Sequence, residues 1–456
     1  MTTLARTILS WLLFPGLIGP LWAAADGDST SSETLPKDLE LETALVLALR
    51  HSPLISQVRA QIKEQEGVLT VARAERLPRL DGVSNYDASG RGRIEGFGNI
   101  VVADQQGWNV DVQLSHVLYN GGARIANNRS AKARVAAAES RMRTVVDGLL
   151  LETSRNYFDG LLARQRIQVQ EDAVGVLERQ LQTAKAGFDA GARPQFDVLQ
   201  AEVALANAKP PVIRARNEYR LAIDRLRRGI GLPYPEGCDA DEVRLTQSWP
   251  NAQVNEQLGD LLLQGLTNRP ELTELAEEIR AATSDVNAAK ATHRARVEMF
   301  GTYGAQSLRF SGDSADNING ATAGVRVVVP LIDMGRTRGQ VQQANARLEQ
   351  IEAQEDQQRL EIEGQVRQAY FDYDEASDIL ETSQLVVKQA SEALRLAQNR
   401  FEAGALTQLE ILQSRLELTR AQLEEVQSLH TYNVAVARLR QAVGTIAREP
   451  SPELTR

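Results

Sequence analysis

Few residues of this 456-residue chain are of the types that break bonds or hold metals. Cys238 is the single cysteine, and the four histidines are scattered, at His51, His116, His293 and His430. A metal centre needs several such ligands at short spacing, and an activated nucleophile needs a base beside it. The glycine-rich stretch "GRGRIEG" at 90–96 lacks the strand-to-helix context of a phosphate-binding loop. We therefore expect no enzymatic activity, no cofactor and no metal site.

Composition narrows the class of protein further. The net charge is −9 and no block of lysines and arginines occurs, whereas nucleic-acid binding needs a basic surface, so we expect no nucleic-acid partner. A single cysteine excludes an internal disulfide, so stability must come from packing or assembly. Aromatic residues are only 5% and helix formers dominate, which favours an extended, mainly helical architecture over a dense globular core.

Polar and small residues gather in two nearly identical stretches, "FDAGARPQFDVLQA" at 188–201 and "FEAGALTQLEILQS" at 401–414. The same offset of 213 residues relates "RLRRGIG" at 225–231 to "RLRQAVG" at 438–444. Such self-similarity over a long distance indicates a tandem duplication. Each repeated stretch must then have the same place in its own copy.

The two copies differ in length in one region only. "HSPL" at 51–54 matches "NRPE" at 268–271 at an offset of 217, so four residues of difference lie between Pro53 and Leu118. Variation confined to one region is typical of surface loops.

Long helices are expected on both sides of the repeated stretches. Residues 122–191 and 335–404 contain no proline, and a helix of that length would extend about 100 Å. Apolar spacings of three and four predict that each rod packs on the helix after it as an antiparallel coiled coil. Pro210-Pro211 is expected to break or kink the first return helix. The spaced residues are Val174, Leu177, Leu181, Ala184 and Phe188, then Phe196, Leu199, Val203 and Ala206; in the second copy Val387, Ala390, Leu394, Ala397 and Phe401, then Leu409, Leu412, Leu416, Thr419 and Leu423.

The repeated stretches themselves are the expected bends of these helical hairpins. Gly191 and Gly404 suit the left-handed residue that ends a helix, and Pro194 suits the first position of the next one. In the second copy Thr407 and Glu410 form a T-x-x-E capping box instead. The helix after the bend therefore begins with a different cap in each copy, although the turn is the same.

Four short segments change from helical to alternating periodicity. Two of them are about as long as a tilted transmembrane strand, although a soluble sheet with one wet face would show the same alternation. The connecting loops, 89–107 and 306–319, are polar and rich in glycine. The clearest strands are 108–118 and 321–331, with weaker partners at 79–88 and 297–305.

The first 25 residues have the pattern of a signal peptide: Arg6, an apolar run from Ile8 to Trp22, then three alanines. No cysteine follows the cleavage site, so a lipidated N-terminus is not expected. With no later run of 18 apolar residues, membrane insertion would require a β-barrel. Four strands cannot close a barrel, because bilayer barrels start at about eight strands, so the sheet edges must pair with other copies of the chain.

The order and spacing of these features resemble the TolC family of outer-membrane efflux and secretion channels. The resemblance covers about residues 39–444 and rests on "VLYNGGAR" at 117–124, "PLIDMGRTR" at 330–338, "NYFDGLLA", "AYFDYDEA" and the two F-x-A-G-A bends. It implies a mainly α fold with a transmembrane β-barrel part. Three chains would form a homotrimer with a twelve-stranded barrel in outer-membrane lipid and a twelve-helix tunnel across the periplasm. In the absence of a lipid-attachment cysteine, the sequence resembles the TolC and type I secretion branch more than the lipoprotein branch that serves multidrug pumps.

The resemblance also suggests which residues narrow the pore. Family members carry acidic residues just past the bend; the matching positions are Asp197 and Glu410, with Gln200 and Gln413 one turn later. Three chains would gather like charges near the axis and favour cations. Acids in a first helical turn also stabilise the helix dipole, and Glu410 has its capping role, so both interpretations stay open.

Two further roles follow from the family pattern. An arginine just after the tip glycine often ties neighbouring helices shut; Arg193 matches it, but Leu406 replaces it in the second copy. Small tip residues would let the helical hairpin of an adaptor approach the backbone, although they also make the turn. The expected adaptor-contact residues are Gly191, Ala192, Gly404, Ala405 and Leu406.

The sequence therefore predicts a passive exit duct of a tripartite export system. It would carry secreted proteins or small molecules handed on by an inner-membrane ABC or proton-driven transporter and a periplasmic adaptor. The alternative is a periplasmic coiled-coil adaptor or structural protein without a pore. The expected division is a signal peptide (1–25), an N-terminal linker (26–38), a first repeat (39–231), an inter-repeat linker (232–253), a second repeat (254–444) and a C-terminal tail (445–456), with β-hairpins at 79–118 and 297–331 and tips near 188–197 and 401–410.

Overall fold

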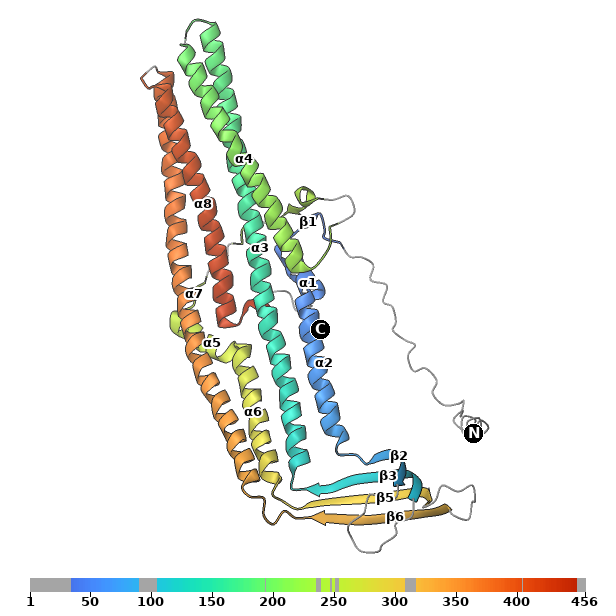
Figure 1. Cartoon of the computed structure of the whole chain (residues 1–456). Coiled ribbons are helices and arrows are strands. Elements are labelled where there is room, and N and C mark those ends of the chain that lie inside the picture. Colours follow the sequence, from blue (N-terminus) through green and yellow to red (C-terminus); the bar gives the residue numbers. More distant parts are fainter. Residues whose placement is uncertain are drawn as a thin grey trace, which may run out of the picture.

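The computed structural model describes residues 34–89, 105–192, 194–234, 239–246, 248–250, 254–307, 317–403 and 405–448. The expected signal peptide, Cys238, Arg193, Gly404 and the end of the C-terminal tail lie outside these residues. The chain is elongated, with a sheet at one end and two helical hairpin tips at the other (Figure 1).

Long helices make up most of the described chain, as predicted. The 67-residue α3 and α7 each extend about 100 Å. Corresponding helices of the two halves have equal lengths, 11, 22, 67 and 36 residues in chain order. The bounds are α1 (Leu41–His51), α2 (Pro53–Ala74), α3 (Ala123–Asp189), α4 (Gln195–Ile230), α5 (Leu258–Asn268), α6 (Pro270–Ala291), α7 (Arg336–Glu402) and α8 (Gln408–Val443).

Four antiparallel strands form one sheet in the order β2-β3-β5-β6: β2 (Arg79–Ser89), β3 (Gln105–Asn120), β5 (Arg296–Ser307) and β6 (Asn317–Val328). The strands extend into both predicted loops, while β6 ends before the predicted residue 331, because Pro330 has no N–H for the ladder. Among the described residues, the outer strands β2 and β6 each have one edge without a partner strand. None of the helices in the described segments has both the length and the hydropathy needed to cross a bilayer.

The helices lie side by side in a single curved layer. Near the tips, α3 packs against α4 and α8, and α8 packs against α7, so the lateral order is α4-α3-α8-α7. Nearer the sheet the order is α2-α3-α6-α7. Helix α7 is thus an outer helix along its whole length (Figure 1).

Short strands wrap the middle of the first hairpin. β1 (Asp38–Leu39) pairs in parallel with β4 (Arg244–Leu245), and we call this pair the belt. The Tyr157 hydroxyl donates to the Leu39 carbonyl at 3.2 Å, and the Tyr219 hydroxyl donates to the Val243 carbonyl at 2.7 Å. The belt and the helices beneath it share the largest core cluster, which includes fully buried Leu35, Leu39, Ile223, Ile230 and Leu245.

Of the expected break or kink at Pro210-Pro211, the break is wrong, because α4 continues through both prolines. Two backbone donors are lost there, which costs a helix several kcal/mol, roughly 3 per proline. Packing on α3 offsets this cost, with ion pairs on both sides of the prolines: Lys185–Glu202 at 3.0 Å and Arg216–Glu171 at 2.7 Å.

The predicted coiled-coil interior of the first hairpin is only partly correct. Ala184 of α3 and Ala201 of α4 are 0% and 1% exposed, whereas Phe196, Leu199 and Val203 are 69%, 52% and 60% exposed. Alanines let the two helices approach closely, and the larger apolar side chains of α4 lie on its other face. The spacing identified an apolar stripe on α4 correctly, but the stripe is exposed in the chain instead of lying in the hairpin interior.

Candidate functional site

The first tip is a tight helix ending followed by a short turn. Helix α3 ends in a Schellman motif, in which the Ala192 N–H donates to the Gly187 carbonyl and the Gly191 N–H to the Phe188 carbonyl, both at 2.8 Å. Gly191 has φ +70°, the left-handed conformation that glycine adopts without strain. Gly191 is therefore the left-handed residue that ends α3, as predicted.

The second tip uses a related ending and a different start. The Ala405 N–H donates to the Arg400 carbonyl at 2.9 Å, the same six-to-one bond as in the first tip. The Glu410 carboxylate accepts from the Thr407 backbone N–H at 2.9 Å and from its hydroxyl at 2.8 Å, so the predicted capping box is present. These hydrogen bonds lower the pKa of the Glu410 carboxyl below its usual value. Glu410 is thus ionised, and its carboxylate is held against the start of α8.

Asp197 has a different environment, although it occupies the equivalent position in the first turn of α4. Pro194 is the N-cap, one residue before the predicted place, and it has no side-chain oxygen with which to cap the helix. The Gln408 side chain, 6% exposed, donates to the Asp197 carbonyl at 3.4 Å and connects the two tips. Asp197 itself is half-buried.

The structure thus brings together the starts of α4 and α8 with both predicted acids. Gln200 is half-buried and Gln413 is exposed, each about one turn further along. Sequence reasoning missed Gln408, because a polar residue at the first position of a helix gives no sign of burial. The Gln408 side chain links the two hairpins at this end.

Below the tips a cavity of about 550 Å³ separates the two hairpins. Arg179 of α3 and Arg415 of α8 line it, together with Gln180 and Phe401. Burial and the neighbouring charge of Arg179 lower the pKa of Arg415. Like charges weaken the contact between the hairpins at this level. The apolar spacing of α3 and α8 contains no sign of this pair.

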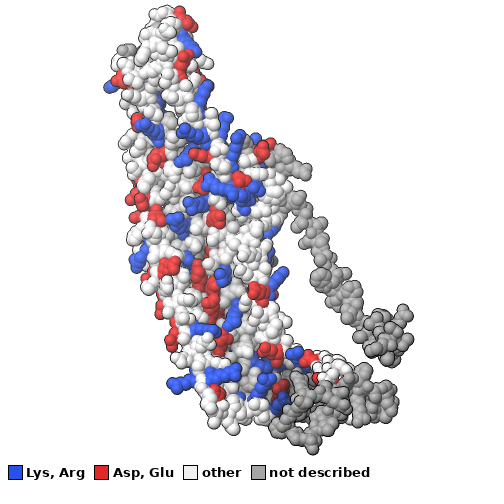
Figure 2. All heavy atoms as spheres, viewed as in Figure 1, with Lys and Arg blue, Asp and Glu red and all other residues white. Residues whose placement is uncertain are grey.

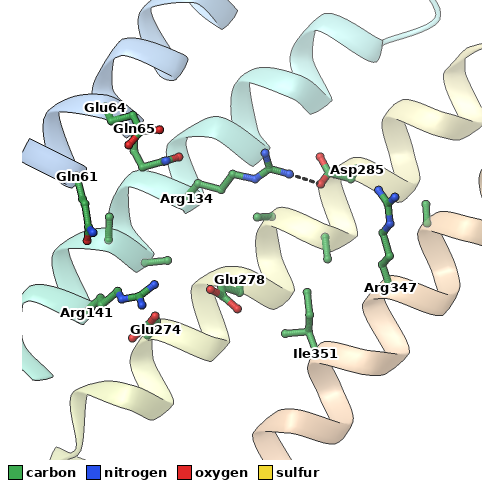
Figure 3. A pocket seen from close by; sticks show the side chains of 15 residues that line it. Gln61, Glu64, Gln65, Arg134, Arg141, Glu274, Glu278, Asp285, Arg347 and Ile351 are labelled. Atoms are coloured by element: carbon green, nitrogen blue, oxygen red, sulfur yellow. Dashed lines mark hydrogen bonds and ion pairs between the residues drawn. The ribbon is translucent and has the colours of Figure 1, made fainter. Parts of the chain in front are cut away.

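A second cavity, of about 490 Å³, lies nearer the sheet on the layer α2-α3-α6-α7 (Figure 3). Side chains from all four helices line it, so this face of the layer is concave. Arg134 of α3 and Asp285 of α6 form an ion pair at 2.8 Å, and Arg141 lies near Glu274 and Glu278. Burial raises the pKa of Glu274. Acidic and basic groups are interspersed here, as they are over the face drawn in Figure 2.

A buried polar cluster lies at the start of α6, close to α3. The Arg269 side chain, 4% exposed, makes two hydrogen bonds to the Glu271 carboxylate at 2.8 and 2.9 Å and one to the Gln365 side chain at 3.0 Å. Asp147 of α3 is 8% exposed. Burial and the charge of Glu271 raise the pKa of Asp147 to about 6, against the opposing effect of Arg269. An ionised Asp147 therefore costs stability at neutral pH.

Replacing Asp147 with asparagine should stabilise the protein at pH 7.5 but not at pH 4. A carboxyl whose folded pKa lies above its unfolded value, 3.8, favours the folded state when protonated. That contribution is lost as the pH rises from about 4 to 6. The Asp147→Asn variant, which carries no charge at this position, should therefore have a free energy of unfolding higher by about 1–2 kcal/mol at pH 7.5, after allowing for solvent screening.

Thermal melts of the helical circular dichroism signal in detergent at both pH values measure this difference. Wild type provides the reference at each pH. An equal gain at pH 4 and pH 7.5, or a loss at pH 7.5, would contradict the assignment of Asp147.

Among the described residues no group of three His, Cys, Asp or Glu side chains is arranged to hold a metal ion. The model of the family described as "Outer membrane efflux protein" matches residues 44–232 and 261–445. The chain is 27% identical over 420 residues to protein CyaE of Bordetella pertussis, covering 90% of this chain and 85% of that one. It is 22% identical over 411 residues to outer membrane protein TolC of Vibrio cholerae, covering 88% and 90%.

A solved structure of the outer-membrane channel OprN superposes with a TM-score of 0.74 at 21% identity, covering 94% of this chain and 98% of that one. These matches confirm the predicted fold class and the resemblance to the TolC family, and they set aside the alternative of a periplasmic adaptor. The chain therefore belongs to the outer membrane efflux protein family and is an outer-membrane channel of a tripartite export system.

Proposed function

We propose that three copies of the chain form a passive exit duct whose periplasmic end is closed and opened by the two hairpin tips. The observation that carries this proposal is the meeting of Asp197 and Gln408, which brings the starts of α4 and α8 together beside two acidic residues. In a trimer, three Asp197 and three Glu410 would surround the axis. Secreted proteins or small molecules would pass through once the hairpins separate, and the Arg179–Arg415 repulsion favours that separation.

The division into two structural repeats, 39–231 and 254–444, is part of the proposal. Its support is the equal length of each pair of corresponding helices and the similar Schellman-type endings of α3 and α7. Parts of the flanking linkers are packed rather than loose, since Leu35 and Val243 are 0% and 1% exposed.

Roles at the tip are divided between the two acids and their neighbours. Asp197 is the stronger candidate for the constriction, because the Glu410 carboxylate already caps α8. Gln200 and Gln413 would line the next turn, and Arg193 would connect neighbouring helices in the closed state. The residues of both turns would form the surface that an adaptor contacts: Gly191, Ala192, Gly404, Ala405 and Leu406.

The energy for transport would come from partners. An inner-membrane ABC or proton-driven transporter would supply the cargo, and a periplasmic adaptor would hold the tips open. The similarity to CyaE favours the type I secretion branch.

Replacing Asp197 with alanine should reduce the cation preference of the channel, by about tenfold if the three carboxylates dominate the field at the constriction. Reversal potentials in planar bilayers under a salt gradient measure this preference. The change should be larger for Asp197→Ala than for Glu410→Ala. Glu417→Ala, which removes an exposed acid of α8 paired with Arg420, is the matched control and should leave selectivity unchanged. If the selectivity of the Asp197→Ala channel were unaltered, Asp197 would not be a constriction residue.

A further inference from the structure

The cavity below the tips is lined by positive charge from both hairpins. Its volume is about 550 Å³, and Arg179 of α3 and Arg415 of α8 line it from opposite sides of the contact between the hairpins. Among the described residues, no aspartate or glutamate lines this cavity. Within that same part of the chain, neither guanidinium forms an ion pair. Two like charges therefore share one cavity without a counter-ion.

The repeat shows that the fold does not require a cation at either position. At the offset of 213 residues, Arg179 corresponds to Glu392 and Arg415 corresponds to Glu202. Each of these acids pairs with a cation of its own hairpin, at 2.6 and 3.0 Å respectively. The helical framework thus accepts an acid at both places, and there the acid has its counter-ion. The two arginines differ from their equivalents in sign and in having no opposite charge within reach among the described residues.

Unpartnered polar atoms lie beside the two charges. The Nε of Arg415 and the Oε1 of Gln180 are buried without a hydrogen-bond partner among the described residues, and both side chains line the cavity. An unpaired donor of a buried charged group is unfavourable, so such atoms are normally satisfied by protein, water or an ion. The Gln180 amide presents its NH₂ group instead of its oxygen after a half-turn. Three side chains thus have donors to offer to an anion in this cavity.

Apolar side chains form much of the remaining wall. Leu394, Phe401 and Ile411 line the cavity. Such walls lower the local dielectric, so an anion between two arginines is attracted more strongly than at an open surface. Burial and the neighbouring charge of Arg179 lower the pKa of Arg415, which means that its protonated form is held here at a cost. A bound anion would offset that cost.

We infer that this cavity is a binding site for a small oxyanion of the phosphate or sulfate type, held between Arg179 and Arg415. A guanidinium presents paired N–H groups whose geometry matches two oxygens of such an anion, and two guanidiniums match a double negative charge. The occupant would join α3 to α8 at the level where the two arginines repel each other. The site lies within one chain and needs no trimer, whereas its effect on the gate rests on the proposed function.

Thermal melts of the full-length protein in detergent test the binding. Inorganic phosphate, exchanged for chloride at constant ionic strength, should raise the melting temperature by about 2–4 °C and then saturate. Arg415→Gln should abolish this response, and it should melt above wild type in phosphate-free buffer because the repulsion is gone. If Arg415 served only to pack the helices, the variant would melt below wild type in that buffer.

The matched control is Arg395→Gln, which removes an exposed arginine of α7 and should respond to phosphate as wild type does. The circular dichroism spectrum of each variant in phosphate-free buffer shows whether it is folded. Isothermal titration calorimetry of phosphate into wild type measures the binding without any variant. A titration without saturable heat, or a melting response that persists in both Arg179→Gln and Arg415→Gln, would overturn the site.

Planar-bilayer recordings test the effect on the gate. Phosphate on the side of the tips should raise the ratio of closed to open channels about tenfold at about ten times its dissociation constant, if only the closed form binds it. Arg415→Gln channels should not respond. Conducting channels that ignore phosphate, although their melting responds to it, would overturn the effect on the gate and keep the site. A preparation without conductance would instead overturn the proposed duct, and the melts would still decide the anion site.

Discussion

Replacing Arg269 with alanine is expected to lower the free energy of unfolding by about 3–5 kcal/mol, because it leaves a buried carboxylate without its partner. The Arg269 side chain is 4% exposed and bonds Glu271, Gln365 and the carbonyls of Gln441 and Ala442. It thus holds the start of α6 to α7 and to the end of α8. The variant also removes the cation that opposes the raised pKa of Asp147.

Thermal melts in detergent, read from the helical circular dichroism signal, measure the loss. Arg269→Lys should recover only part of it, because an ammonium group cannot make the paired bonds of a guanidinium. Arg420→Ala is the matched control: its partner Glu417 is 65% exposed, so the change should be small. If Arg269→Ala melted like Arg420→Ala, the cluster would have no structural role.

Replacing Tyr157 with alanine is expected to cost about 3–5 kcal/mol, the usual range for removing a buried aromatic side chain. Tyr157 is 1% exposed, packs edge-on against Phe158 with ring centroids 6.4 Å apart, and donates to the Leu39 carbonyl. Its loss would open a cavity under the belt and release the belt from α3.

Two variants separate packing from hydrogen bonding at this site. Tyr157→Phe keeps the ring and should lose only about 1 kcal/mol. Tyr370→Ala, at the equivalent place in the second repeat, should lose less than Tyr157→Ala because that ring is only partly buried. Limited proteolysis near Leu39 reports on the belt directly, and faster cleavage is expected for Tyr157→Ala. Equal losses for Tyr157→Ala and Tyr157→Phe would contradict the packing argument.

The sequence predicted the elements well, because their causes are local. Proline-free stretches with three-four spacing produced α3 and α7, alternation produced the strands, and Thr407 with Glu410 produced the capping box. Contacts between distant segments could not be predicted in the same way. The burial of Gln408, the Arg179–Arg415 pair and the bonds of Arg269 depend on which helix faces meet, and periodicity does not specify that.

The wrong expectation and the partly correct one have the same origin. Pro210-Pro211 breaks an isolated helix, but α3 supports α4 on either side of the prolines. The apolar stripe with Phe196 and Val203 reads as a hairpin interior, yet alanines occupy that interior. In both cases tertiary packing overrides a rule that holds for single helices.

The belt also has a mechanical consequence. The belt contacts α3 up to Arg164, whose guanidinium donates to the Leu245 carbonyl. From Arg164, 25 residues of helix extend to Asp189. That overhang is a lever arm of about 38 Å, so a tilt of about 5° at the belt would displace the tip by about 3 Å. With the belt as the pivot, a given torque on α3 needs less force at the tip than near the middle of the helix, and the tip moves farther than the part of α3 beside the sheet.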